Sequence, residues 1–315
     1  MRRFKNILLL HDGRPEHHLT MKRGVDLATR NQAKLTVVDV IEEDSWVPGE
    51  IYGSQPFLEL KELVSEERQK ELDIVIEPLT QQGLDVRAKL LFGKPFLEII
   101  HEVLRENHDL VMKTAQGEGG LKGMLFGSTA MHLMRKCPCP VWVLKRGENE
   151  RFDRIIAAVD PDPSDEQRNQ LNFKIMDLAT SLAKLEQSEL LVVHAWSLYG
   201  ETILRSGRGR VDPEKIDKLV REAEAEHKER LNNLLQKYKL QDLNHRVHLI
   251  KGEAGRVIPE LAEKKRADLI VMGTLSRSGV AGFLVGNTAE KIISEVDCSV
   301  LTVKPDGFVT PVKFS

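Results

Sequence analysis

Short apolar runs alternate with longer segments of mixed polarity along the chain. In the first half, the apolar runs predict strands near 6–11, 34–40, 85–91, 109–113 and 140–145. The segments between them predict helices near 16–31, 56–82, 95–106 and 127–136, and the second half repeats the pattern with a long charged helix at 212–239. Strands separated by helices favour a parallel sheet covered on both faces. We therefore expect an α/β protein with two doubly wound domains, each with a five-stranded parallel sheet.

The two halves are also similar residue by residue. Residues 109–145 align with residues 268–304 at a constant offset of 159 (268 minus 109), with identical pairs such as Gly127 and Gly286. The front of each half is an apolar run that ends on an aspartate, Asp12 in FKNILLLHD and Asp160 in FDRIIAAVD. A tandem duplication predicts a domain at 1–148, a second at 149–305 and a tail at 306–315, with a polar linker around 146–153.

The first candidate site residues are the two aspartates that close these first strands. In a doubly wound sheet, ligands bind at the carboxyl ends of the strands, where the strand order reverses. Asp12 and Asp160 are predicted to lie at that edge. An aspartate there can contact a ligand, or it can cap the turn or helix that follows. The sequence leaves both interpretations open.

A glycine-containing loop in each half is the second candidate. In GTLSRSGVAGFLVGN, residues 273–287, Gly273 and Gly286 frame small residues after an apolar run. Glycine permits positive φ and lets backbone N–H groups approach an anion closely. A helix is predicted to follow Gly286 and Gly127, with Asn287 and Ser128 as N-caps, so its dipole would favour a phosphate. Turns between strands and helices also need glycine when nothing binds, which is the structural alternative.

These loops carry a resemblance to a known family. The second half reads Gly273-x2-Ser276-x9-Gly286-Asn287 and the first reads Thr114-x2-Gly117-x9-Gly127-Ser128. Both resemble the G-x2-G-x9-G-(S/T) motif of nucleotide-binding universal stress proteins, and the whole chain is similar to their tandem, E-type members. Each half lacks one motif glycine, because Thr114 and Ser276 take those places.

The resemblance implies an adenine nucleotide α-hydrolase-like, Rossmann-like fold and a stress-response protein that binds ATP or a related adenine nucleotide. A magnesium ion accompanying that nucleotide is the one metal it implies. It also implies that family domains pair through their last strands, so that this chain forms an intramolecular pseudo-dimer, or a homodimer. The implied site residues are Asp160, Ala195, Gly273, Ser276, Gly286, Asn287 and Thr288 in the second half, and Asp12, Val40, Gly117, Gly127 and Ser128 in the first.

Composition narrows the function classes. The chain has 46 Lys and Arg against 48 Asp and Glu, a net charge of -2, so it has no field that would gather nucleic acid or an anionic membrane. Its apolar runs are too short for a membrane span or a signal peptide, which predicts a soluble cytoplasmic protein. Three cysteines make no disulfide framework, and Cys137-Pro-Cys139 lacks a second ligand pair for a metal.

Catalytic motifs are absent as well. The sequence contains no G-x-S-x-G, no H-E-x-x-H and no P-loop lysine motif. We therefore expect a binder, with at most very slow ATP hydrolysis. The alternative is a nucleotide-independent scaffold, or a carrier of another small, apolar ligand, because neither half keeps the complete motif.

Overall fold

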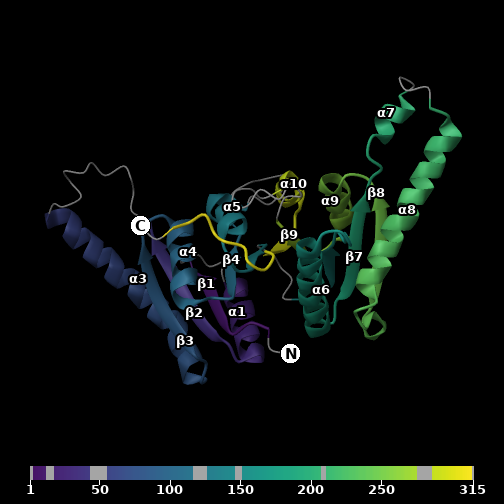
Figure 1. Cartoon of the computed structure of the whole chain (residues 1–315). Coiled ribbons are helices and arrows are strands. Elements are labelled where there is room, and N and C mark those ends of the chain that lie inside the picture. The colour runs from purple at the N-terminus through teal and green to yellow at the C-terminus, as the bar shows by residue number, and fades with distance from the viewer. Residues whose placement is uncertain are drawn as a thin grey trace. The chain divides into compact units, whose positions relative to one another are not determined.

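The computed structural model describes residues 3–11, 18–42, 55–115, 126–145, 151–206, 211–274 and 286–313, except for the side chain of Pro56 (Figure 1). The chain forms two compact units. Unit 1 is Met1–Glu150 together with Val309–Ser315, and unit 2 is Arg151–Phe308. Strands and helices alternate in both, so the α/β fold class expected from the sequence is confirmed.

Unit 1 contains five parallel strands. The strands are β1 (Asn6–Leu10), β2 (Lys34–Ile41), β3 (Val86–Phe92), β4 (Leu110–Thr114) and β5 (Val141–Leu144). The helices between them are α1 (His18–Asn31), α3 (Gln55–Gln81), α4 (Pro95–Glu106) and α5 (Gly127–Lys136). The strand order is β3-β2-β1-β4-β5, and every neighbouring pair is parallel. The order therefore reverses between β1 and β4, which is the switch point of a doubly wound sheet.

Unit 2 repeats this topology. Its strands are β6 (Arg154–Ala158), β7 (Glu189–Trp196), β8 (His245–Lys251), β9 (Leu269–Gly273) and β10 (Ser299–Val303). Its helices are α6 (Glu166–Glu186), α7 (Glu201–Arg205), α8 (Pro213–Leu235), α9 (Ala254–Lys265) and α10 (Asn287–Glu295), with a 3-10 turn, η2, at Leu240–Asp242. The order β8-β7-β6-β9-β10 is parallel throughout and places the switch point between β6 and β9.

The core of each unit lies on both faces of its sheet. All five residues of β4 and of β10 are buried. Successive side chains of a strand point to opposite faces, so a strand that is buried throughout must be covered on both sides. The outer strands β3 and β8 are more exposed. Among the described residues, no helix is long and apolar enough to cross a membrane.

The predicted elements agree with the structure to within one or two residues in the described part of unit 1, although residues 16 and 17 of the first predicted helix lie outside it. The predicted end of the long helix in unit 2 is wrong. We expected the helix to reach residue 239, but α8 ends at Leu235. There the Tyr238 N–H bonds back to the Leu235 carbonyl as a turn, and the Tyr238 hydroxyl donates to the Phe173 carbonyl at 3.0 Å. This tertiary contact ends the helix and has no local sequence signal.

The C-terminal tail packs against unit 1. Val312 is buried, and His101 Nε2 on α4 lies 3.1 Å from the Lys313 carbonyl oxygen. Because a carbonyl oxygen only accepts, the His101 Nε2–H donates this bond. Only Val309–Ser315 of the predicted tail 306–315 belong to unit 1; residues 306–308 remain with unit 2, where Lys174 forms an ion pair with Asp306 at 2.5 Å. The last residues of the chain therefore belong to the unit that also contains the first.

Candidate functional site

Strand register places the candidate residues of unit 2 along one edge. Ala158 on β6 is paired with Val193 on β7 and with Met272 on β9. Two residues beyond these paired positions, the three backbone segments reach Asp160, Ala195 and Thr274. The structure thus brings Asp160 and Ala195 together at the carboxyl edge beside the switch point, with Gly273 at the end of β9. This is the edge where doubly wound sheets bind ligands.

Two asparagines of α6 hold the chain that leaves β6. Asn172, which is 2% exposed, accepts a hydrogen bond from the Asp160 N–H at 2.8 Å and donates one to the Asp160 carbonyl at 3.0 Å. Asn169 does the same for Asp162, accepting from its N–H at 3.1 Å and donating to its carbonyl at 2.6 Å. These bonds fix the backbone of Asp160 and satisfy polar groups that would otherwise be costly to bury.

The carboxylate of Asp160 is held by an arginine of α6. Arg168 Nη2 lies 3.0 Å from Asp160 Oδ2, and its Nη1 lies 2.7 Å from Asp162 Oδ2. Arg230 on α8 approaches Asp162 at 3.9 Å. The Ser164 hydroxyl and backbone N–H, with the two arginines, hold the pKa of Asp162 below its usual value, although burial acts in the opposite direction. The Asp160 side chain keeps 39% of its surface exposed, so it remains accessible from solvent.

Asp160 does not cap the helix that follows it. The N-cap of α6 is Asp165, whose carboxylate accepts from the Arg168 N–H at 2.9 Å. The hypothesis that Asp160 caps the following helix is therefore wrong.

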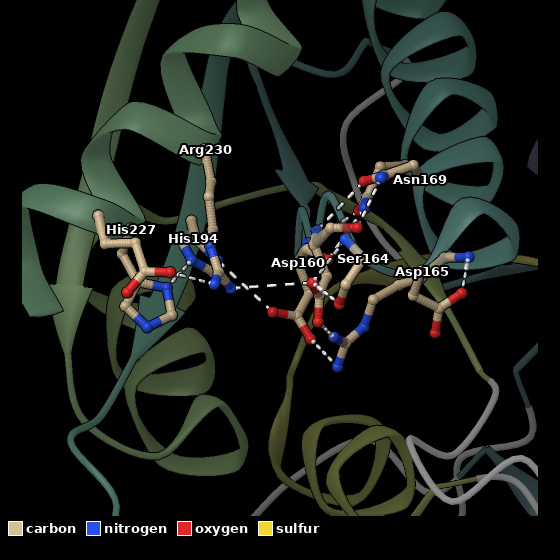
Figure 2. A network of polar contacts seen from close by, with 11 residues as sticks. Asp160, Ser164, Asp165, Asn169, His194, His227 and Arg230 are labelled. Atoms are coloured by element: carbon tan, nitrogen blue, oxygen red, sulfur yellow. Dashed lines mark hydrogen bonds and ion pairs between the residues drawn. The ribbon is translucent and has the colours of Figure 1, made fainter.

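A histidine pair completes the network on the side of Asp160 towards α8 (Figure 2). His194, fully buried on β7, has Nδ1 at 3.1 Å from the Val159 carbonyl oxygen and at 3.8 Å from Asp160 Oδ1. Its Nε2 lies 2.9 Å from Nδ1 of His227 on α8. The His227 ring also stacks on Trp196, with 5.6 Å between ring centroids. The network therefore ties β6, β7 and α8 together beside Ala195.

The N-terminus of α10 closes the same edge. The Gly286 N–H donates to the Thr274 carbonyl at 3.0 Å, which fixes the start of the helix against the end of β9. The predicted N-cap, Asn287, is wrong: Gly286 is the N-cap, Asn287 is the first helical residue, and no N-cap side chain bonds to the first turn. Asn287 and Thr288 are exposed. The backbone N–H groups of this turn can therefore serve an anion, as helix N-termini often do.

The two glycines that frame this loop, Gly273 and Gly286, do not have the positive φ that we expected. Gly286 has φ of -61° and ψ of 139°, a conformation open to any residue. A Cβ on Gly273 would lie 2.6 Å from Leu171 Cδ2, so this glycine lets α6 pack closely on β9. Positive φ occurs instead at Gly127 in unit 1, where φ is 74°. Ser276, the residue in place of a motif glycine, lies outside the described residues.

In unit 1, fewer candidate residues can be placed. Val40 is half-buried near the end of β2, and its N–H donates to Asp39 Oδ1 at 2.8 Å. Gly127 and Ser128 begin α5, whose N-cap is Phe126, so the predicted cap at Ser128 is also wrong. Asp12 and Gly117 lie outside the described residues. The structure therefore places the second strand and the helix N-terminus of this site, but not its aspartate.

Sequence reasoning missed Arg168, Asn172, His194 and His227. Their partners lie 6 to 35 residues away and on other elements or turns, so no periodic pattern marks them. The contact that corresponds to the histidine pair in unit 1, between Arg68 and the buried Asp39 at 2.6 Å, is likewise visible only in the structure.

The cysteine pair does not form a reactive site. Cys137 and Cys139 are buried, with their Sγ atoms 3.5 Å apart. The hydrogen bond to Cys137 and burial raise the pKa of the Cys139 thiol well above its usual value, which keeps it protonated and unreactive. Among the described residues, no group of three or more His, Cys, Asp or Glu side chains could hold a metal ion.

Comparisons with known proteins identify the family. A model of the "Universal stress protein family" matches residues 3–145 and again residues 151–304. Universal stress protein E of Escherichia coli K12 is 28% identical over 316 residues, covering 99% of this chain and 98% of that protein. Among solved structures, a putative universal stress protein from Pseudomonas aeruginosa UCBPP-PA14 matches with a TM-score of 0.70 at 22% identity, covering 98% of this chain and 95% of that one.

A universal stress protein from Archaeoglobus fulgidus DSM 4304 matches with a TM-score of 0.64 at 18% identity, covering 95% of this chain and 98% of that one. The two structures support the fold, and the double match to the family model confirms the duplication. The chain belongs to the universal stress protein family, as a member with two tandem domains.

Proposed function

We propose that unit 2 binds an adenine nucleotide such as ATP at the carboxyl edge of its sheet, and that binding rather than turnover is its function. Membership of the family supports a role in the stress response. In this proposal Asp160 and Ala195 face the nucleoside, and the first turn of α10 receives the phosphates. A magnesium ion would accompany those phosphates.

The observation that carries the proposal is the convergence at this edge. Strand register brings Asp160, Ala195 and Thr274 side by side, and Gly286 joins the start of α10 to Thr274. A partly exposed carboxylate is suited to ribose hydroxyls, and a helix N-terminus without a side-chain cap is suited to phosphate. These groups come from three strands and one helix, so the rigid sheet holds them in place.

The geometry favours binding over hydrolysis. Hydrolysis needs a group that positions or deprotonates the attacking water. The Asp160 carboxylate, which could serve as such a group, is engaged in an ion pair with the Arg168 guanidinium at 3.0 Å. We expect turnover to be far slower than the roughly 1 to 1000 per second of ordinary enzymes.

Titration calorimetry of the full chain with ATP tests the proposal. Gly286→Val adds a side chain at the N-terminus of α10 without backbone strain, because its φ and ψ suit valine. We expect the ATP affinity to fall about tenfold or more, ~1.4 kcal/mol per factor of ten. Glu253→Val is the matched control: Glu253 is the N-cap of α9, with φ of -69°, ψ of 126° and no side-chain cap bond. That variant should bind ATP as the parent does.

Two results would contradict the proposal. One is an ATP affinity that is the same in Gly286→Val and in the parent protein. The other is phosphate release near one per second at saturating ATP, which would indicate an enzyme.

A further inference from the structure

One polar pair in each unit ties the long helix to the second strand, and the two pairs are equivalent. In unit 1, Arg68 Nε on α3 lies 2.6 Å from Asp39 Oδ2 on β2. In unit 2, the same places are taken by His227 on α8 and His194 on β7. Asp39 and His194 hold equivalent positions in the two sheets, because their register partners on β3 and β8, Leu90 and Leu249, are related by the repeat offset of 159 (249 minus 90). Unit 2 thus has a titratable pair where unit 1 has an ion pair.

Hydrogen-bond geometry limits how many protons the histidine pair can hold. The Val159 carbonyl only accepts, so His194 Nδ1 carries a proton. One further proton lies between His194 Nε2 and His227 Nδ1. A third proton fits on His227 Nε2 and gives the pair a single positive charge. A fourth would place two N–H groups against each other across the 2.9 Å contact and break the bond.

The surroundings of the pair do not favour a second positive charge. From the chain after β6, Asp160 Oδ1 faces His194 at 3.8 Å, but the Asp160 carboxylate is shared with Arg168 of α6. On α8, the Glu226 carboxylate is engaged by Arg230, which also approaches Asp162 at 3.9 Å. On β7 and β8, Trp196 stacks on His227, and Lys251 lies 5.9 Å from the Trp196 ring. Because His194 is fully buried, a second charge would be costly in this position.

We propose that the His194–His227 pair is an acid-sensitive latch that regulates the proposed nucleotide site. At neutral pH the hydrogen-bonded pair holds α8 against β7. When the pair takes up its fourth proton, the bond breaks and α8 separates from β7. Ala195 follows His194 directly, and Asp160 faces the His194 ring, so separation disturbs the site and lowers nucleotide affinity. The part about nucleotide affinity rests on the proposed function, whereas the release of α8 does not.

The sign of the pH dependence follows from proton linkage. The closed latch binds at most three ring protons and the separated histidines bind four, so acid favours the separated state. Ordinary histidines become protonated below about pH 6.5, so release should develop below that pH. One extra proton shifts the equilibrium by up to about tenfold per pH unit.

Amide hydrogen exchange on the full chain at pH 7.5 and 5.5 tests the latch, after correction for intrinsic exchange rates. Burial lowers the pKa of His248, so protonation of His248 at low pH also affects the stability of unit 2. The test therefore needs a measurement that is local to α8. Helix α3 is an internal reference, because arginine and aspartate ordinarily stay ionised in this pH range. We expect the protection of α8 relative to α3 to fall about tenfold at the lower pH, with weaker ATP binding by calorimetry.

The decisive variant replaces the histidine pair of unit 2 with the aspartate and arginine of the unit 1 pair. His194→Asp combined with His227→Arg should keep α8 equally protected at both pH values. His227→Asn is a smaller change, because the Asn amide can donate a hydrogen bond to a neutral His194 or accept one from a protonated His194. It should also remove the pH response of α8. His245→Asn is the control, since His245 bonds to the Leu243 carbonyl at 3.0 Å at the start of β8, and it should leave the response intact.

The outcomes separate the two proposals. Equal protection of α8 at both pH values in the parent chain would overturn the latch, and so would a full response in His227→Asn. If ATP binds at neither pH, the proposed function fails, while the exchange of α8 still decides the latch.

Discussion

At the scale of single residues, Asp162 shows how neighbouring groups stabilise a charge. Its Oδ1 accepts from the Ser164 hydroxyl at 2.7 Å and from the Ser164 N–H at 3.1 Å, and its Oδ2 accepts from Arg168. These bonds favour the carboxylate over the acid and lower the pKa of Asp162. The charged form in turn holds Arg168, which also binds Asp160.

We predict that Ser164→Ala raises the pKa of Asp162 towards its ordinary value. A folded-state pKa below the unfolded value contributes stability that is present above the unfolded pKa, about 3.9, and is lost as pH falls through the folded pKa. In the variant, this contribution should therefore be smaller, and its loss should be complete at a higher pH. Carboxyl NMR titration measures the pKa, and Ser164→Thr, which keeps a hydroxyl, should leave it near the parent value. The same pKa in Ser164→Ala and in the parent would refute the assigned cause.

At the scale of secondary-structure elements, the order of strands and helices was predictable and the polar contacts between elements were not. Buried strands such as LIVMG in β9 are continuous apolar runs, which a sequence pattern reveals directly. Asp160 and Ala195 could be predicted because strand ends determine their place. The bonds from Arg168, Asn172 and His227 depend on the packing of α6 and α8 on the sheet. The predicted N-caps are wrong by one or two residues. The cap of α10 is Gly286, one residue before Asn287, and the cap of α5 is Phe126, two residues before Ser128.

Helix α6 gives a prediction at this scale. Asp165 caps the helix by accepting from the backbone N–H of Arg168, the residue whose side chain binds Asp160 and Asp162. We expect Asp165→Ala to cost about 1 kcal/mol of unfolding free energy in unit 2, as loss of a helix cap does. Hydrogen exchange over residues 166–186 measures the cost, and Asp165→Ser, which can still cap, should recover most of it. An unchanged exchange rate in Asp165→Ala would show that the cap is not needed.

At the scale of the whole molecule, the tail makes unit 1 depend on the far end of the chain. Deletion of residues 309–315 removes the buried Val312 side chain and the acceptor of the His101 bond. We expect about 2.5 kcal/mol less stability, from roughly 1.5 kcal/mol for valine burial and about 1 kcal/mol for the hydrogen bond. Exchange in α4 should increase, while exchange in α9, its counterpart in unit 2, should not. An equal increase of exchange in α9 and in α4 would contradict this assignment.

The return of the tail also determines the order of events during synthesis. Unit 1 begins at the N-terminus, but its last seven residues, Val309–Ser315, are translated after all of unit 2. A ribosome that has finished residue 150 has therefore produced unit 1 without the tail that covers α4. Unit 2 can fold as soon as it emerges, whereas unit 1 is completed only after residues 309–315 have also emerged. A nascent chain stalled before residue 309 should accordingly carry a finished unit 2 and an unfinished unit 1.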